Sequence, residues 1–364
     1  MNKYICILIL ILILIFLFFF NINYIEYYTD NLETTIKNKY NLYDFKVNNI
    51  NNNLFNTPIK YNNKLNYYNL NTSKQYSIKY KNRNIWIDIP NKLNKDKYPF
   101  VLYIQPEGEN GVQKNNKGES KFSSSDTNPL HKCLNYLITQ GIAVISLEPD
   151  PEDMWYWMRD GINYDFKCIN NSKNYQAGVG CFNSKKNKDI DYFNFAFDYI
   201  YNHNKLDYNN MFVIGYSAGS QMVSASIGEF PFLYTKLNRP YPKIKAAIMI
   251  AGGSQYCYTY YDISKLPDIF KPCYNKKLGC CPKDATEYNF MNGKLNYSQH
   301  PPTFLFQTNQ DNNADKNASN YYFDACTKYN IPSAKIIAEG NWHGLVTSQE
   351  YLFNLIIQYY LSTK

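Results

Sequence analysis

The segment MFVIGYSAGSQMVSASI, residues 211–227, joins a continuous apolar run to a mixed run of small, polar and apolar residues. Residues 211–214 are typical of a short buried strand, and residues 220–227 are predicted to form a helix. Between them, residues 215–219 read GYSAG, the pattern G-x-S-x-G. The two glycines remove the side chains that would clash in so sharp a strand-to-helix turn, and the serine between them is held in a strained backbone conformation.

Ser217 is therefore the candidate nucleophile, with its hydroxyl projecting into solvent. The predicted helix points its first N–H groups back at the same place, so the N–H of Ala218 is expected to stabilise an oxyanion. A glycine-rich turn with an inert serine is the alternative. The flanking strand and helix, together with an aspartate and a histidine further along the chain, favour the catalytic interpretation.

The histidine that fits this role is His343. Of the four histidines it alone follows both the serine and a suitable aspartate, in the short loop GNWHG between the last predicted strand and the last predicted helix. Asp311 follows the end of another predicted strand, so all three side chains belong to the carboxyl edge of the sheet. Asp315 is the alternative carboxylate, but it fits the first turn of a helix, where it would complement the helix dipole. The order Ser217, Asp311, His343 matches the Ser…Asp…His order of one hydrolase fold.

Strands and helices are predicted to alternate from residue 99 onward, which implies an α/β fold with a mostly parallel central sheet and helices on both faces. Upstream, residues 76–80 and 85–89 alternate polar and apolar side chains around a polar turn, as a β-hairpin does. This hairpin gives the sheet an antiparallel N-terminal edge. The other predicted strands are residues 99–104, 142–147, 245–250, 303–306 and 334–338, and the other helices are residues 129–140, 191–202, 315–329 and 347–361.

These motifs resemble the α/β-hydrolase superfamily, and the domain that carries them is bounded as residues 75–364. The run from residue 205 (KLD) through GYSAG is similar to secreted esterases of the dienelactone-hydrolase and polyhydroxybutyrate-depolymerase type. Residues 302–311 and 342–344 resemble the acid and histidine loops of that superfamily. The resemblance implies an α/β-hydrolase fold and a serine hydrolase.

One loop departs from the superfamily pattern. Relatives often carry His-Gly after the third core strand, where this chain has Gln105-Pro106-Glu107. Pro106 has no N–H to donate. The N–H of Glu107 is therefore the expected second donor of the oxyanion hole, beside that of Ala218.

Two long loops, residues 148–188 and 254–300, are rich in aromatic residues and cysteine. Loops of this length in a compact domain are commonly functional, and these two are predicted to form a cap over the substrate. The candidate substrate-binding residues are aromatic, and ordinary packing is the alternative for the first two of them: Trp155, Trp157, Tyr216 and Trp342.

The N-terminal segment has a different character, because residues 5–20 are all apolar. A helix of that length spans roughly 24 Å, close to the thickness of a membrane core. Residues 1–22 are predicted to be a signal peptide or, because no small-x-small cleavage site follows, an uncleaved signal-anchor with the rest of the chain in the lumen or exterior. Residues 23–74, rich in Asn and Tyr, are predicted to be a stalk or an N-terminal wrap.

The chain has nine cysteines, one within the apolar run and eight after it. An even number clustered in loops suits disulfides in an oxidising compartment, with free thiols as the alternative. The N-x-S/T sequons at Asn71, Asn170, Asn296 and Asn317 are potential glycosylation sites. The eight cysteines are Cys133, Cys168, Cys181, Cys257, Cys273, Cys280, Cys281 and Cys326.

The formal net charge of +8 comes from lysines scattered along the chain, without a dense basic run or a nucleic-acid-binding motif. No nucleic-acid partner is therefore expected. The sequence has no C-x-x-C pair that would indicate zinc, and neither a metal nor a cofactor is expected.

The expected activity is hydrolysis of a small or polymeric carboxylic ester through a Ser-His-Asp triad and an acyl-enzyme. A peptidase of the same fold is one alternative, although the chain has no recognisable propeller domain. The other is a catalytically inactive α/β-hydrolase that serves as a surface binding module. The three triad residue types argue against an inactive protein, whereas the altered loop at residues 105–107 argues for one.

Overall fold

A computed structural model describes residues 33–38, 42–50, 73–90, 96–106, 129–149, 188–228, 242–252, 300–311, 317–341 and 343. Residues 1–22 lie outside these ranges, so the signal-anchor or signal peptide stays a prediction. The two predicted cap loops also lie almost entirely outside them. Within the described ranges, no helix combines the length and the apolar character that crossing a membrane requires.

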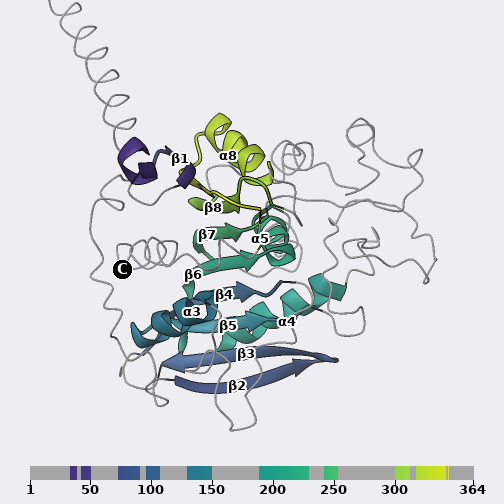
Figure 1. The fold of residues 1–364 in the computed structure, drawn as a ribbon. Coiled ribbons are helices and arrows are strands. Elements are labelled where there is room, and N and C mark those ends of the chain that lie inside the picture. Colours follow the sequence, from purple (N-terminus) through teal and green to yellow (C-terminus); the bar gives the residue numbers. More distant parts are fainter. Residues whose placement is uncertain are drawn as a thin grey trace, which may run out of the picture.

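The described strands form one nine-stranded sheet in the order β1-β9-β8-β7-β6-β4-β5-β3-β2, which runs from the top to the bottom of Figure 1. Strands β4 to β9 are parallel to one another. Strand β3 pairs antiparallel with both β2 and β5, which confirms the antiparallel N-terminal edge. The strands are β1 (Leu42–Asn48), β2 (Ser73–Tyr80), β3 (Arg83–Pro90), β4 (Tyr98–Ile104), β5 (Ala143–Leu147), β6 (Leu206–Tyr216), β7 (Ile244–Ile250), β8 (Thr303–Thr308) and β9 (Ser333–Ala338).

The order of the central strands reverses at β4. The chain first adds β5 on one side of β4 and then returns to add β6 on the other side. In sheets of this kind, ligands bind beyond the carboxyl ends of the strands at such a switch point. The chain has the α/β-hydrolase fold, and its switch point lies directly before the G-x-S-x-G turn. The described helices that connect the strands are α3 (Pro129–Thr139), α4 (Lys188–Asn202), α5 (Ala218–Gly228) and α8 (Ala318–Lys328).

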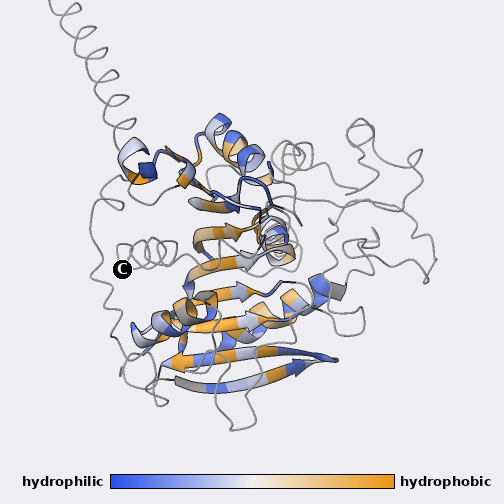
Figure 2. Cartoon of the chain, in the orientation of Figure 1, coloured by the Kyte–Doolittle hydropathy of each residue, from blue (hydrophilic) through white to orange (hydrophobic). Residues whose placement is uncertain are grey.

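Helices cover both faces of the sheet, as predicted. Side chains of α4, α5 and α8 pack in one buried cluster with alternate residues of the strands. Side chains of α3 pack in a second cluster with the intervening residues of the same strands. Figure 2 shows how strongly apolar the central strands are compared with the edge strand β2. Because parallel strands covered on both faces have no solvated side, a continuous apolar run is what such strands require.

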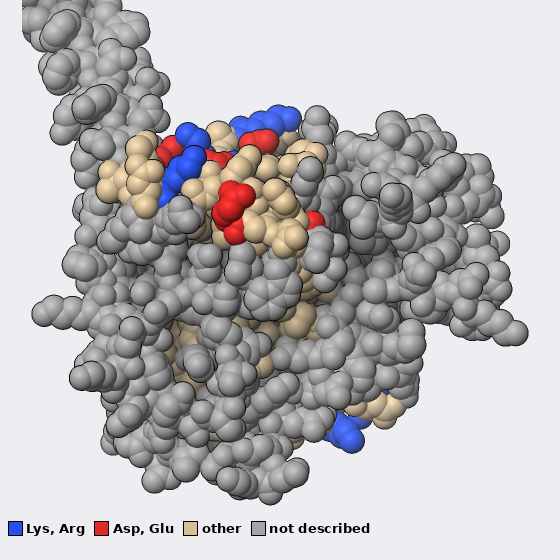
Figure 3. Space-filling model, in the orientation of Figure 1, with Lys and Arg blue, Asp and Glu red and all other residues tan. Residues whose placement is uncertain are grey.

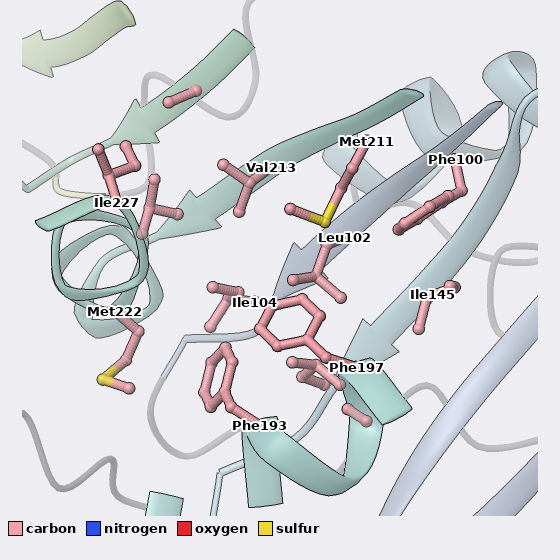
Figure 4. Close-up of a cluster of buried hydrophobic side chains, with 14 of the residues drawn as sticks. Phe100, Leu102, Ile104, Ile145, Phe193, Phe197, Met211, Val213, Met222 and Ile227 are labelled. Carbon is pink, nitrogen blue, oxygen red and sulfur yellow. The ribbon is translucent and has the colours of Figure 1, made fainter. Parts of the chain in front are cut away.

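The buried cluster that contains side chains of α4 and α5 packs these helices onto the sheet beside the G-x-S-x-G turn. Figure 4 shows side chains of β4 and β6 meeting those of the two helices in this cluster. A buried apolar side chain contributes about 1.5–3 kcal/mol relative to an exposed one, so this packing fixes α5 firmly against the sheet. The labelled residues are Phe100, Leu102, Ile104, Ile145, Phe193, Phe197, Met211, Val213, Met222 and Ile227.

Strand β1 is an element that the sequence analysis did not find. It lies within the segment predicted to be a stalk or wrap, and it pairs antiparallel with β9 at the far edge of the sheet. Phe45 points into the second buried cluster, and an ion pair of 2.8 Å joins Asp44 to Lys335 of β9. On the face shown in Figure 3, acidic and basic side chains lie close together around β1 and α8. A second ion pair, of 2.7 Å, joins Lys46 of β1 to Glu33.

A buried polar network ties the hairpin to β5 and α4. Arg83 of β3 forms an ion pair with Asp189 of α4 and donates hydrogen bonds of 2.8 and 3.1 Å to the carbonyl oxygen of Glu148, directly after β5. The Arg83 guanidinium also lies 3.7 Å from the ring centroid of Tyr192. Burial raises the pKa of Glu148, although hydrogen bonds from Asn84 and the other donors to its carboxylate act in the opposite direction.

The prediction of disulfides is wrong for Cys133 and Cys326. Both side chains are buried free thiols. Cys133 belongs to the cluster on the α3 face and Cys326 to the cluster on the opposite face, so the sheet separates them. Burial raises the pKa of both thiols, which keeps them protonated and unreactive. Of the eight cysteines that follow the apolar run, the other six lie outside the described residues.

Candidate active site

The turn between β6 and α5 has the strained geometry that its sequence predicts. Ser217 adopts a positive φ of 53°, a conformation that is costly for a residue with a side chain. A Cβ at Gly215 would lie 2.2 Å from the carbonyl oxygen of Gly219. A Cβ at Gly219 would lie 2.2 Å from the carbonyl oxygen of Ile104, so only glycine lets α5 begin this close to the end of β4.

Hydrogen bonds hold the turn in this conformation. The N–H of Ser217 donates to the carbonyl oxygen of Ile250 in β7, at 2.8 Å. The carbonyl oxygen of Ser217 accepts from the N–H of Ser220 at 2.9 Å and from its hydroxyl at 2.6 Å. Gly252 leaves room for that hydroxyl, because a Cβ there would lie 2.0 Å from Ser220 Oγ. The backbone of the serine is thus fixed by contacts within the protein itself.

The structure brings Ser217, His343 and Asp311 into one hydrogen-bonded chain. The Nε2 atom of His343 lies 2.8 Å from the Ser217 Oγ. Its Nδ1 atom lies 2.8 Å from both carboxylate oxygens of Asp311. A carboxylate only accepts hydrogen bonds, so Nδ1 carries the imidazole proton and Nε2 is the acceptor that faces the serine hydroxyl. Both Asp311 and His343 are buried, which strengthens the interaction between them.

The loops that carry Asp311 and His343 are tied to each other. The N–H of Gln310 donates to the carbonyl oxygen of Gly340 at 3.0 Å. The N–H of Gly340 donates in return to the side-chain oxygen of Asn309 at 2.9 Å, and Gly340 has a φ of 138°, which favours glycine. Asn309 and Gly340 are supporting residues that the sequence analysis missed, although both stand within three residues of a predicted triad member.

The other three histidines have different partners, which agrees with the choice of His343. His131 lies edge-on to Tyr103, and the Nε2 of His203 lies 2.6 Å from the Tyr76 hydroxyl. The Nε2 of His300 lies 3.1 Å from the Tyr322 hydroxyl. Burial lowers the pKa of His300 to about 4.

Of the other predicted site residues, the structure describes Ala218 and Tyr216. Ala218 is the first residue of α5, and the first N–H groups of a helix have no carbonyl partner within it. Tyr216 lies against the imidazole of His343, with ring centroids 5.5 Å apart. The candidates outside the described residues are Glu107, Trp155, Trp157, Trp342 and the alternative carboxylate Asp315.

Residues 105 and 106, which directly follow β4, bear on which N–H is the second donor to an oxyanion. The N–H of Gln105 donates to the carbonyl oxygen of Leu147 at 3.1 Å. The side-chain amide of Gln105 is buried and donates to Ser146 Oγ at 2.7 Å. Pro106 has no N–H. Neither Gln105 nor Pro106 therefore offers an uncommitted backbone N–H to an oxyanion.

In the parts of the chain that the structure describes, no group of three or more His, Cys, Asp or Glu side chains is placed to hold a metal ion. The arrangement found there is that of a nucleophile, a base and an orienting carboxylate.

No protein-family model and no curated protein matches the chain. Among solved structures, the chain is similar to an acylaminoacyl peptidase from Pyrococcus horikoshii, with 11% identity, a TM-score of 0.47, and coverage of 79% of this chain and 40% of that one. An arylesterase matches with 15% identity, a TM-score of 0.43, and coverage of 80% and 83%. Esterase B from Lactobacillus rhamnosis matches with 13% identity, a TM-score of 0.44, and coverage of 80% and 85%. The chain spans about two fifths of the length of the peptidase.

Proposed function

We propose that this protein is a serine hydrolase that cleaves carboxylic esters through an acyl-enzyme. The observation that carries the proposal is the unbroken line of hydrogen bonds from Ser217 through His343 to Asp311. Its members come from the carboxyl ends of β6, β8 and β9, so the sheet places three side chains distant in sequence at one edge.

In the first step, the Ser217 oxygen attacks the ester carbonyl carbon while its proton passes to Nε2 of His343. The carbonyl π electrons move to oxygen, which becomes a tetrahedral oxyanion. Asp311 accepts the hydrogen bond from Nδ1 and stabilises the imidazolium that forms. The imidazolium then gives the Nε2 proton to the leaving alcohol oxygen as the carbon–oxygen bond breaks, and the acyl group stays on Ser217.

A water molecule reverses these roles in the second step. It loses a proton to Nε2 and attacks the acyl carbon, and the same proton returns to Ser217 Oγ when the acid leaves. The N–H of Ala218 stabilises the oxyanion in both steps, because the start of α5 presents it beside the nucleophile. The N–H of Glu107 is the proposed second donor.

Two alternative functions are a peptidase and an inactive binding module. A peptidase would use the same three residues, and only the substrate distinguishes it. An inactive binding module is less favoured, because such a protein has no need to hold Ser217 at a φ of 53° or to align His343 with it.

The proposal extends to the parts outside the described residues. Residues 5–20 would anchor or export the chain, placing the catalytic domain in the lumen or outside the cell. The loops at 148–188 and 254–300 would form the cap, with Trp155, Trp157 and Trp342 against the substrate. The six cysteines in or beside these loops would form disulfides there.

Turnover of p-nitrophenyl esters from acetate to palmitate by the full chain in detergent tests the activity. We expect Ser217→Ala to lose at least ~10³-fold in kcat. Ser226→Ala is the matched control, since Ser226 also lies in α5 and its hydroxyl donates to the carbonyl oxygen of Val223. The chain-length preference would report the depth of the acyl pocket. A folded protein with no turnover of any ester, or with turnover that survives Ser217→Ala, would overturn the proposal.

A further inference from the structure

The imidazole of His343 is contacted on one ring face as well as at its two nitrogens. Asp311 lies at Nδ1 and Ser217 at Nε2. The ring of Tyr216 stacks on the imidazole, with a centroid distance of 5.5 Å and an angle of 30° between the planes. Asp311 from the end of β8, and Tyr216 and Ser217 from the end of β6, thus face the imidazole from two elements of the sheet.

The position of the Tyr216 ring is set by the sheet itself. Tyr216 is the last residue of β6 and pairs with Ile250 of β7. The ring packs against the buried cluster on the α3 face. Because Tyr216 is joined directly to Ser217, one segment of backbone places both the nucleophile and the aromatic face against which the base lies.

Two physical effects follow from this contact. An aromatic face attracts a cation within about 6 Å of its centroid, so the ring favours the imidazolium that forms during catalysis over the neutral imidazole that precedes it. The ring also restricts rotation of the imidazole about its Cβ–Cγ bond, which keeps Nε2 directed at Ser217. Both effects act on His343 and neither requires contact with the substrate.

We propose that Tyr216 is a positioning residue for His343, which orients the imidazole and stabilises its protonated form. The inference rests on the proposed hydrolase activity and assigns Tyr216 a role different from the substrate contact that the sequence suggests. The two roles have different kinetic signatures. A positioning residue changes kcat alike for every ester, whereas a substrate contact changes KM in a way that depends on the acyl chain.

The test compares Tyr216→Phe, Tyr216→Leu and Tyr216→Met with the full-length protein on p-nitrophenyl acetate and p-nitrophenyl octanoate. The Phe variant keeps the aromatic face, whereas the Leu and Met variants remove it. The Met variant is included because its flexible side chain can fill the space if the Leu variant does not fold. We expect Tyr216→Phe to retain kcat within about twofold. The two aliphatic variants should lose about tenfold in kcat on both esters, with KM unchanged within about twofold.

Two further readouts separate positioning from general damage. The rate of fluorophosphonate labelling should fall by the same factor as kcat. The acidic limb of the kcat/KM profile should move to lower pH in the aliphatic variants, since a less stable imidazolium forms only at higher proton concentration. Tyr43→Leu is the control for loss of a tyrosine, because Tyr43 is 54% exposed and lies in β1, outside the site.

Aliphatic variants that keep wild-type kcat would overturn the inference. It would also fail if Tyr216→Phe lost as much activity as Tyr216→Leu, or if KM rose for one ester and not the other. These outcomes differ from failure of the proposed function, in which the wild-type protein itself would neither turn over esters nor react with a fluorophosphonate.

Discussion

Asp311 owes its position beside His343 to the strand that precedes it. It follows β8 after a two-residue turn whose N–H groups are bonded to residues 338 and 340, and its carboxylate therefore reaches the imidazole of His343. The sequence favoured Asp311 over Asp315 for the same reason, because residues at the carboxyl ends of parallel strands share one edge of the sheet. The sequence pattern predicted that Asp311 lies at this edge, but it could not show the hydrogen bond between Gly340 and Asn309 that holds the Asp311 loop in place.

Replacement of the two aspartates tests this choice. Asp311→Asn should lower kcat for p-nitrophenyl acetate by about 10³- to 10⁴-fold, because an amide can donate to Nδ1 and favour the wrong imidazole tautomer. Asp315→Asn, the matched control, should keep kcat within about threefold. A large loss of kcat in Asp315→Asn, with little change in Asp311→Asn, would show that Asp315 and not Asp311 is the carboxylate that orients His343.

His300 gives the stability of the protein a pH dependence. Burial lowers its pKa to about 4, below the value of about 6.5 in an unfolded chain. The unfolded state therefore binds more protons between these values, and stability falls as the pH falls through that window. Acidification from pH 7.5 to pH 5 should therefore lower the free energy of unfolding by about 2 kcal/mol through this residue.

The measurement is urea unfolding at both pH values. In His300→Gln the fall in stability on acidification should be smaller by about 2 kcal/mol than in the wild type. Equal falls in the two proteins would show that His300 is not kept neutral by the fold.

At the scale of elements, the buried network around Arg83 joins three segments that are far apart in sequence. Removing one partner of a buried ion pair leaves the other charge desolvated. Arg83→Met should therefore lower the unfolding free energy by about 3–5 kcal/mol, and adding Asp189→Asn should recover part of the loss. Lys79→Met on the neighbouring strand removes an exposed charge and should change stability by less than ~0.5 kcal/mol. An Arg83→Met effect as small as that of Lys79→Met would contradict the account.

Elements with a continuous apolar run or clear alternation were predictable, and the exceptions have physical causes. The hairpin and the parallel strands were recognised because burial on one or both faces imposes a regular pattern. Strand β1 was missed because only two side chains of its sequence, LYDFKVN, are fully buried, those of Leu42 and Phe45. An edge strand that pairs on one side needs few apolar residues, and composition alone does not separate it from a polar segment. The start of β6 was missed for a similar reason, since Asp207 and Asn209 interrupt its apolar pattern.

At the scale of the molecule, β1 covers the edge of the sheet that would otherwise be left by β9. An uncovered edge strand is a template for association with other chains. A chain that begins at residue 51 lacks β1 and its buried residues Leu42 and Phe45. We expect it to melt at least ~10 °C below a chain that begins at residue 33, and to self-associate in size-exclusion chromatography with light scattering. Equal melting temperatures and two monomers would show that β1 is dispensable.

The most direct test of the central claim is covalent labelling of Ser217. The full-length protein, in detergent, is treated with a fluorophosphonate at neutral pH and digested, and the labelled peptide is identified by mass spectrometry. The account predicts one label per chain, on Ser217, with no label in Ser217→Ala and at least ~10³-fold slower labelling in His343→Ala. A folded wild-type protein that stays unlabelled, or a label on another serine, would contradict it.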